Sequence, residues 1–320
     1  MFYWGAGIAT VAAWVAQRIG RKGRVDMSGI CQQRVSRRQF LRGGLAFAAA
    51  AMAFGSRSVL GGDRDGCARW AFLSDTHIAA DPDNHFRGFY PYRNLQEITS
   101  QLGCDPPEGL VITGDLARLK GRPEAYTNLK TLLAPLAEKR PVYLGLGNHD
   151  NRKDFFRTFE DSRGGQTVNN RQVVVADAGP VRLIVLDTLL HINRIPGMLG
   201  SPQRTWLEAY LRTCDDRPTI LFLHHTPKVD LLDTGRLFRI IGPMTKVKAV
   251  VHGHTHRFRV SQYMGIHLVN LPAAGFNFGD SQPIGWVEAT LTSKSGDFLL
   301  RAVGGNTRLN GQTTKLAWRS

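Results

Sequence analysis

Five short clusters of polar residues contain the side chains of this sequence that could bind metal ions. In chain order they are Asp75-Thr76-His77, Gly114-Asp115, Gly147-Asn148-His149-Asp150, His224-His225 and Gly253-His254-Thr255-His256. Carboxylate, carboxamide and imidazole groups without thiolates are typical ligands of Mn, Fe, Zn and similar divalent ions in catalytic sites. The gaps between Asp75, Asp115, Asn148, His224 and His254 are 40, 33, 76 and 30 residues. This ordered set predicts a site for two divalent metal ions.

Each cluster taken alone also has an ordinary structural interpretation. Asp75 or Asp115 could cap the element that follows its strand, and His77 could lie on the surface. The histidine clusters are more specific, because a buried histidine needs a hydrogen-bond partner for each ring nitrogen and a metal ion satisfies one of them. Of the adjacent pair, we favour His224 over His225 as the ligand, because His224 directly follows an apolar run.

The clusters fall where predicted strands end. Apolar runs at 68–74, 109–113, 142–146, 219–223 and 247–251 each lead into one cluster. Helical spacing of apolar residues predicts helices over 92–102, 123–136 and 202–211. Two hairpins are expected at 172–187 and 257–271, followed by strands at 285–291 and 298–303. This alternation predicts one α/β domain, with the polar clusters gathered at the carboxyl ends of its strands.

Together the clusters resemble the motifs of the calcineurin-like metallophosphoesterase superfamily, D-x-H, G-D, G-N-H-D/E, H and G-H-x-H. The resemblance covers about residues 68–303, with all five motifs intact. It implies an α/β fold that is a four-layer sandwich of two mixed β-sheets flanked by helices. It also implies hydrolysis of a small phosphoester, with a metal-bridging hydroxide as the nucleophile.

The resemblance also implies a role for each residue of the motifs. One ion would be held by Asp75, His77 and His256. The other would be held by Asn148, His224 and His254, and the Asp115 carboxylate would bridge the two. His149 would be the general acid that protonates the leaving alkoxide, and Asp150 would orient His149 from behind.

Three further residues are candidates for contact with the substrate: Arg152, His225 and His191. Arg152 lies four residues after Asn148 and could instead be a solvated surface residue. His225 could be hydrogen-bonded beside the site without touching the substrate. His252, in strand phase with His254, could support a ligand or simply be buried.

Three local segments of the sequence indicate a particular group within the superfamily. Residues 121–126, the run from Gly147 to Arg152, and Pro202-Gln203-x-x-Trp206-Leu207 look like the group that contains class III cyclic-nucleotide phosphodiesterases and bacterial glycerophosphodiesterases. Asn151 and Thr226 depart from that group, which commonly has Asp and Pro there. We therefore expect a phosphodiesterase. The alternatives are a phosphomonoesterase or nucleotide pyrophosphatase on the same site and, third, a non-enzymatic metal-binding protein.

The formal charge of +15 raises the question of a nucleic-acid partner, so its distribution matters. Residues 1–53 carry eight Lys and Arg against one acid, or +7, and the other 267 residues carry +8. The main part of the chain is thus only mildly basic, which suits an anionic substrate. Because no dense basic stripe with interleaved aromatic residues is present, a nucleic-acid partner is not expected.

The first part of the chain has the layout of an export signal. Ser36-Arg37-Arg38-Gln39-Phe40-Leu41-Arg42 precedes an apolar, alanine-rich run over 43–54, as in a twin-arginine signal. Ala51-Met52-Ala53 offers a cleavage site, although the signal could instead remain as an anchor. An earlier apolar stretch is short for a membrane span, and Met27 would be a natural start for a signal of normal length.

These features predict three regions. Residues 1–66 would be an amino-terminal extension, signal and linker, residues 67–304 the catalytic domain, and residues 305–320 a loose polar tail. We expect the twin-arginine export machinery to be a partner, and the mature protein to act in the periplasm or cell envelope. No transmembrane domain is expected beyond an uncleaved signal.

Overall fold

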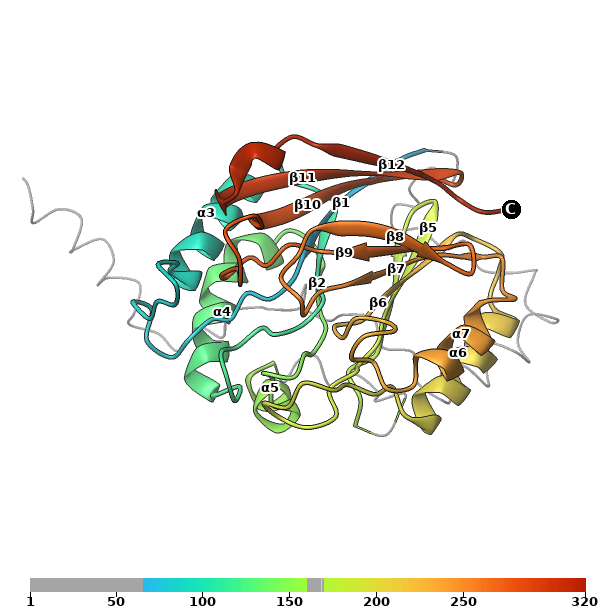
Figure 1. Cartoon of the computed structure of the whole chain (residues 1–320), viewed down its shortest axis with the longest axis horizontal. Coiled ribbons are helices and arrows are strands. Elements are labelled where there is room, and N and C mark those ends of the chain that lie inside the picture. The colour runs from blue at the N-terminus through green and yellow to red at the C-terminus, as the bar shows by residue number, and fades with distance from the viewer. Residues whose placement is uncertain (1–65, 160–167, 169) are drawn as a thin grey trace, which may run out of the picture.

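The computed structural model of the protein describes residues 66–159, 168 and 170–320, and these residues form two facing six-stranded sheets (Figure 1). The first sheet has the strand order β12-β11-β10-β1-β2-β3. The pairs β1–β2 and β2–β3 are parallel, and the other pairs are antiparallel, so the sheet is mixed. Its strands are β1 (Ala68–Leu73), β2 (Gly109–Ile112), β3 (Val142–Leu144), β10 (Pro283–Leu291), β11 (Ser295–Gly305) and β12 (Thr313–Ala317).

The second sheet has the order β4-β5-β6-β7-β9-β8 and is also mixed. Its four inner strands β5, β6, β7 and β9 run parallel, and antiparallel strands close both edges. Its strands are β4 (Val174–Ala178), β5 (Val181–Val185), β6 (Thr219–Phe222), β7 (Val247–His252), β8 (Arg259–Tyr263) and β9 (Ile266–Asn270).

Helices cover the outer faces of both sheets. The helices α3 and α4 lie on one side of the molecule in Figure 1, and α6 and α7 lie on the opposite side. Three apolar clusters fill the spaces between these layers, one under each helical layer and one between the sheets. The helices are α3 (Pro91–Cys104), α4 (Pro123–Ala137), α5 (Arg152–Thr158), α6 (Ser201–Thr213) and α7 (Thr234–Ile241), with a 3₁₀ turn at Thr307–Leu309.

The central strand β1 shows how the sequence produces these layers. Side chains alternate across a strand, so Ala71 and Leu73 pack toward the helices whereas Trp70 and Phe72 pack toward the second sheet. All four side chains are buried, which explains the continuous apolar run in the sequence. Burial of β1 on both faces requires a layer on each side of its sheet, here the helices on one side and the second sheet on the other.

The predicted fold class is confirmed: two mixed sheets flanked by helices form an α/β sandwich. The predicted strands and the three predicted helices are present, with ends shifted by a few residues. The short helices α5 and α7 were not predicted. α7 carries Leu237, Phe238 and Ile241 on its buried face, and α5 is capped by Asn151, whose side chain accepts from the backbone N–H groups of Lys153 and Asp154.

The prediction of a loose tail after residue 304 is wrong. Residues 313–317 form the edge strand β12, which pairs antiparallel with β11. Beyond it, the Arg319 guanidinium donates to the backbone carbonyls of Ile241, Gly242, Met244, Val247 and Met264. This segment of the chain therefore ties the first sheet to the end of α7 and to the second sheet.

The predicted export signal, its cleavage site and most of the linker lie outside the described residues. Within the part of the chain that the structure describes, no helix is both long and apolar enough to cross a membrane.

Candidate metal centre

The carboxyl ends of five strands meet at one edge of the sandwich and bring the polar clusters together. Asp75 follows β1, Asp115 follows β2, and Asn148 follows β3, all from the first sheet. His224 follows β6, and the pair His254 and His256 follows β7, from the second sheet. Two groups of side chains result whose ligand atoms lie within 4.8 Å of one another: Asp75, His77 and His256, and Asp115, His224 and His254. Six of the seven residues that the resemblance implies as ligands lie in these two groups, and the seventh, Asn148, is buried at the end of β3.

The distances within the site show that the ligand atoms converge. Nε2 of His77 lies 3.1 Å from Nε2 of His256, which in turn is 3.2 Å from Oδ1 of Asp75. Oδ2 of Asp115 lies 3.7 Å from Nε2 of His77 and 3.3 Å from Nε2 of His224. The Asp115 carboxylate thus lies between the two groups, in the place of a bridging ligand.

Several of these atoms are buried without any hydrogen-bond partner among the described residues. They are Oδ1 of Asp75, Oδ1 of Asn148, both ring nitrogens of His224 and Nδ1 of His254. A buried polar atom left unpaired costs about 1–3 kcal/mol, so a cluster of them needs an explanation. Divalent cations would satisfy the listed atoms of Asp75, Asn148 and His254 and one ring nitrogen of His224, and the residues present therefore fit a metal centre.

The backbone of the ligands is in an unusual conformation. Five candidate ligands have φ between 46° and 73°, in the left-handed region: Asp75, His77, Asp115, His254 and His256. Such φ values are uncommon for residues other than glycine, and they concentrate at functional sites where surrounding structure holds them in place. Neighbouring backbone hydrogen bonds supply this support, from Asp75 N–H to the Gly114 carbonyl and from His77 N–H to the Asp115 carbonyl.

The electrostatics of the site favour a cation. Burial opposes ionisation of Asp75 and Asp115, but neighbouring imidazoles hold the pKa of both carboxyls well below its ordinary value. Burial lowers the pKa of His77 to about 3 and that of His254 to about 4, so both rings are neutral. Burial also opposes a charge on His224, yet the Asp115 and Asp75 carboxylates raise the pKa of His224 to about 9. Ionised carboxylates and neutral imidazoles are the forms that bind metal ions, so His224 would release its proton when an ion binds.

Neighbouring acceptors outside the centre orient two of the candidate ligand histidines, His256 and His254. Nδ1 of His256 lies 2.5 Å from the Phe276 carbonyl, so it carries the proton and leaves Nε2 for the centre. Nε2 of His254 lies 3.2 Å from Oδ2 of Asp230, which leaves Nδ1 for the centre. Asp230 is only 9% exposed, and burial raises its pKa to about 6. No motif pointed to Asp230, because it lies in the loop between β6 and α7.

His149 faces the centre, but Asp150 does not orient it as predicted. Nδ1 of His149 contacts the Leu119 carbonyl at 3.0 Å, and its Nε2 lies 3.9 Å from Oδ2 of Asp115. The Asp150 carboxylate instead accepts hydrogen bonds from the Tyr126 hydroxyl and from three backbone N–H groups, those of Leu116, Ala117 and Gly147. A carbonyl therefore has the orienting role that we expected of Asp150, and Asp150 holds the loops after β2 and β3 together.

The predicted substrate contacts receive less support from the structure. The Arg152 guanidinium binds Asp187 through two hydrogen bonds, of 2.6 and 2.9 Å, and also donates to the Leu189 carbonyl, so it anchors α5. His225 is fully buried, with Nδ1 2.8 Å from the Thr188 hydroxyl. His191 is exposed on the loop after β5, and a backbone hydrogen bond from Asn193 to the Asn148 carbonyl connects that loop to the centre.

Of the remaining histidines, His252 is buried beside the site. Its Nδ1 lies 3.4 Å from the Gly253 carbonyl, and burial lowers its pKa to about 4. His85 and His267 lie elsewhere, the first against the Tyr90 ring and the second against the Ala317 carbonyl.

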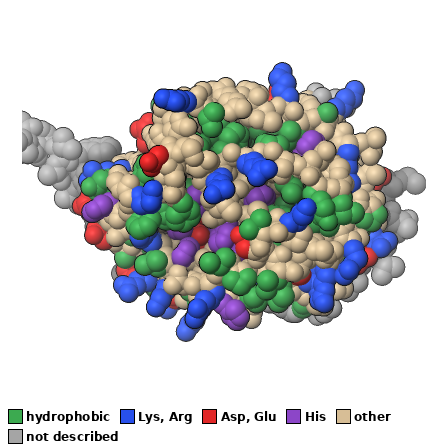
Figure 2. Space-filling model, viewed as in Figure 1, with side chains coloured by type: hydrophobic (Ala, Val, Ile, Leu, Met, Phe, Trp, Pro, Cys, Tyr) green, Lys and Arg blue, Asp and Glu red, His purple; other side chains and the backbone are tan. Residues whose placement is uncertain are grey.

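Histidine side chains are visible near the middle of the face shown in Figure 2, with Lys and Arg side chains around them. This surrounding positive charge is suited to attract an anionic substrate.

Curated relatives of the chain include two kinds of phosphodiesterase. It is 29% identical to the glycerophosphodiester phosphodiesterase GpdQ of Enterobacter lignolyticus over 219 residues, 63% of this chain and 76% of the relative. It is 32% identical to a cAMP/cGMP dual specificity phosphodiesterase of Mycobacterium tuberculosis over 207 residues, 61% of this chain and 63% of the relative.

Solved structures share the fold at lower identity. A dimetal phosphatase from Danio rerio has a TM-score of 0.64 at 14% identity, covering 80% of this chain and 100% of that one. A purple acid phosphatase from yellow lupin has a TM-score of 0.61 at 16% identity, covering 80% and 54%. The family model of calcineurin-like phosphoesterases matches residues 68–258, which is more than half of the chain. The protein therefore belongs to the calcineurin-like phosphoesterase family and is a metal-dependent phosphoester hydrolase.

Proposed function

We propose that the protein is a phosphodiesterase that uses two divalent metal ions. The observation that carries this proposal is the pair of buried ligand groups, one centred on Asp75 and the other on His224, with Asp115 between them. The names of the curated relatives support a diester as the substrate. Oxygen and imidazole donors suit manganese, iron and zinc ions alike, so the ligand types are compatible with each of the three.

Each candidate ligand has a defined role in the proposed hydrolysis. Asp75, His77 and His256 would hold one ion, Asn148, His224 and His254 the other, and Asp115 would bridge them. When bound, the ions supply the acidity that makes a water molecule nucleophilic near neutral pH, and they neutralise charge on the phosphoryl oxygens. The chain contributes rigid ligands, because their orientation is set by Asp230, by the Phe276 carbonyl and by the backbone of the strand ends.

His149 is proposed as the general acid. Its side chain is 24% exposed, unlike the buried ligands, so a substrate oxygen can reach it. The contact of Nδ1 with the Leu119 carbonyl keeps one proton there, and Nε2 faces the space beside Asp115. An imidazolium in this position can donate its Nε2 proton to the departing alkoxide of the ester.

The test compares a diester with a monoester on the purified domain. Residues 54–320, stripped of metal and then loaded with Mn²⁺, are expected to hydrolyse bis(p-nitrophenyl) phosphate faster than p-nitrophenyl phosphate, and EDTA should abolish both activities. Preference for the monoester would favour the phosphomonoesterase alternative. Absence of hydrolysis with Mn²⁺, Fe²⁺ and Zn²⁺ would refute an enzymatic role.

We also propose that the enzyme acts outside the cytoplasm, on the basis of the run from Ser36 to Arg42 and the apolar stretch after it. The full-length chain, fused to a reporter that is active only after export, should give signal in a bacterium with the twin-arginine pathway. Replacing Arg37 and Arg38 together by Lys should remove the signal. An unchanged signal from the double variant would refute this route.

A further inference from the structure

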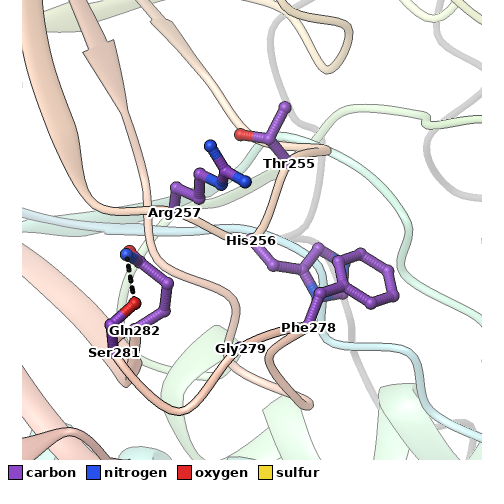
Figure 3. A pocket seen from close by; sticks show the side chains of 7 residues that line it. All are labelled: Thr255, His256, Arg257, Phe278, Gly279, Ser281 and Gln282. Atoms are coloured by element: carbon purple, nitrogen blue, oxygen red, sulfur yellow. Dashed lines mark hydrogen bonds between the residues drawn. The ribbon is translucent and has the colours of Figure 1, made fainter.

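An open pocket of about 290 Å³ lies beside the metal centre on the side of the second sheet. It is lined by Thr255, His256, Arg257, Phe278, Gly279, Ser281 and Gln282 (Figure 3). His256 is one of the candidate metal ligands, so the pocket begins one side chain away from the place where the phosphate would bind. Its volume is at the small end of ligand pockets and suits a single flat group.

Phe278 is the unusual residue of this pocket. Its ring lies over the ring of His256, with centroids 4.3 Å apart and planes inclined by 25° (Figure 3). Phe278 nevertheless remains 58% exposed. One face of the ring is therefore covered by His256, and the exposed area leaves the other face open to solvent.

The exposure of Phe278 is not the result of a loosely held loop. The segment 273–282 is anchored on both sides of Phe278. Before it, the Ala274 and Gly275 N–H groups donate to the carbonyls of Ser74 and Asp75. Across it, the Asn277 carboxamide donates to the Gln282 carbonyl at 2.7 Å. A fixed loop that presents an aromatic face to water beside a catalytic centre is typical of a binding surface.

Arg257 supplies a positive charge in the same pocket. It directly follows His256, its side chain is exposed, and it forms no ion pair with any residue in the described ranges. The Gln282 carboxamide also lines the pocket, but it donates to the Ser281 hydroxyl and accepts from the Phe258 N–H, which leaves the Arg257 guanidinium as the free polar group there (Figure 3). An aromatic face with a free guanidinium nearby can stack a flat ring and hydrogen-bond its polar edge.

From this arrangement we propose that the pocket binds the non-departing arm of the phosphodiester, and that this arm carries a flat aromatic ring such as a nucleobase. The ring stacks on the open face of Phe278 while Arg257 contacts its polar edge. This inference rests on the proposed function, because it assigns the retained arm of a diester that the metal centre would cleave.

The experiment uses two diesters that release the same p-nitrophenolate and differ only in the retained arm. Thymidine 5′-(p-nitrophenyl phosphate) carries a base, and methyl p-nitrophenyl phosphate does not. The readout is the ratio of their kcat/KM values on the Mn²⁺-loaded protein. We expect a ratio well above one, and we expect Phe278→Ala to reduce it about 5- to 100-fold, the usual effect of losing one base-stacking side chain. Phe278→Trp should preserve it.

The matched control is Phe86→Ala. Phe86 is also partly exposed and also packs against Phe276, but it does not line the pocket. This variant should keep the wild-type ratio.

Three results would overturn the inference: a wild-type ratio near one, an equal loss on both substrates in Phe278→Ala, or the same fall in ratio in Phe86→Ala. Hydrolysis of the methyl ester without preference for thymidine would leave the phosphodiesterase proposal standing. Failure to hydrolyse either ester would refute both this inference and the phosphodiesterase proposal.

Discussion

At the scale of single residues, two of the candidate ligand histidines, His254 and His256, have one ring nitrogen at the centre and the other beside a neighbouring acceptor. The acceptor is the Phe276 carbonyl for His256 and the Asp230 carboxylate for His254. These contacts select the tautomer, so the ligand nitrogen arrives unprotonated. Asp230 is accordingly a positioning residue, which acts on the metal through His254.

Replacing Asp230 should weaken metal binding without removing a ligand. We expect Asp230→Ala to lower metal affinity about 10- to 100-fold, and Asp230→Asn to lower it less, because its carbonyl oxygen can still accept from Nε2 of His254. The measurement is the metal content retained after dialysis against a graded series of chelator concentrations. Asp83→Asn, an exposed acid elsewhere, is the control. Equal retention by Asp230→Ala and the wild type would contradict the role.

His149 should matter most when the leaving group is poor. His149→Gln is expected to slow hydrolysis of an alkyl diester about 10²- to 10⁴-fold, and to slow a p-nitrophenyl diester much less, because p-nitrophenolate departs without a proton. The measurement is kcat across a series of esters of rising leaving-group pKa, with metal content checked. His85→Gln, an exposed histidine outside the site, should leave the series unchanged. A uniform loss across the series would exclude the acid role.

At the scale of elements, the metal centre depends on how closely the ends of β1 and β7 approach each other. Gly253, just after β7, makes this approach possible. A Cβ atom there would lie 1.8 Å from the Ser74 hydroxyl oxygen and 2.4 Å from Oδ2 of Asp75. The glycine is thus required by the junction of the two sheets.

Gly253→Ala should therefore separate the ligand groups. We expect it to destabilise the fold by about 1–3 kcal/mol, the usual cost of overpacking, and to weaken metal binding as well. Gly235→Ala is the matched control, because Gly235 lies in α7 with no atom within 4 Å of an added Cβ. It should be neutral or stabilise by up to about 1 kcal/mol. Denaturant unfolding of both variants measures the difference, and equal stability would show that the junction tolerates a methyl group.

The motifs predicted the ligand set because each one is contiguous and sits at the end of an apolar strand. What they could not predict depends on loop conformation. The contact of Leu119 with His149, the place of Asp230 behind His254, and the ion pair that occupies Arg152 all join residues from different loops. No periodicity in the sequence marks such contacts.

Three elements were missed, α5, α7 and β12, and for β12 and α7 the composition of the segment supplies the physical reason. β12 is an edge strand in which only Leu316 is buried, so its sequence is as polar as a loop. α7 is eight residues long, and its three buried apolar positions are too few to separate a helix from a buried turn.

At the scale of the whole molecule, the two candidate ligand groups join the two sheets. Each group contains residues from both: Asp75 and His77 with His256, and Asp115 with His224 and His254. Metal binding and the association of the sheets should therefore be coupled, because an ion binds the folded sandwich and not the unfolded chain.

Metal removal should lower the thermal stability measurably. With free Mn²⁺ at 100 times its dissociation constant, one site adds about 2.7 kcal/mol of stability. For a domain of this size we expect Tm to rise by roughly 5–10 °C over the EDTA-treated protein. The variant with Asp75→Asn and Asp115→Asn together should show no such shift. A wild-type Tm that is independent of Mn²⁺ would contradict the coupling.

The position of β1 has a consequence for the order in which the protein can be made. β1 lies in the middle of its sheet, where it pairs with β2 on one edge and with the much later β10 on the other, so that Ala68 lies opposite Leu291. While the chain is being synthesised, β1 and β2 exist long before β10, so one edge of β1 stays unpaired until late. An open strand edge of this kind invites pairing with other chains. The first sheet is therefore complete only after the final strands have been made.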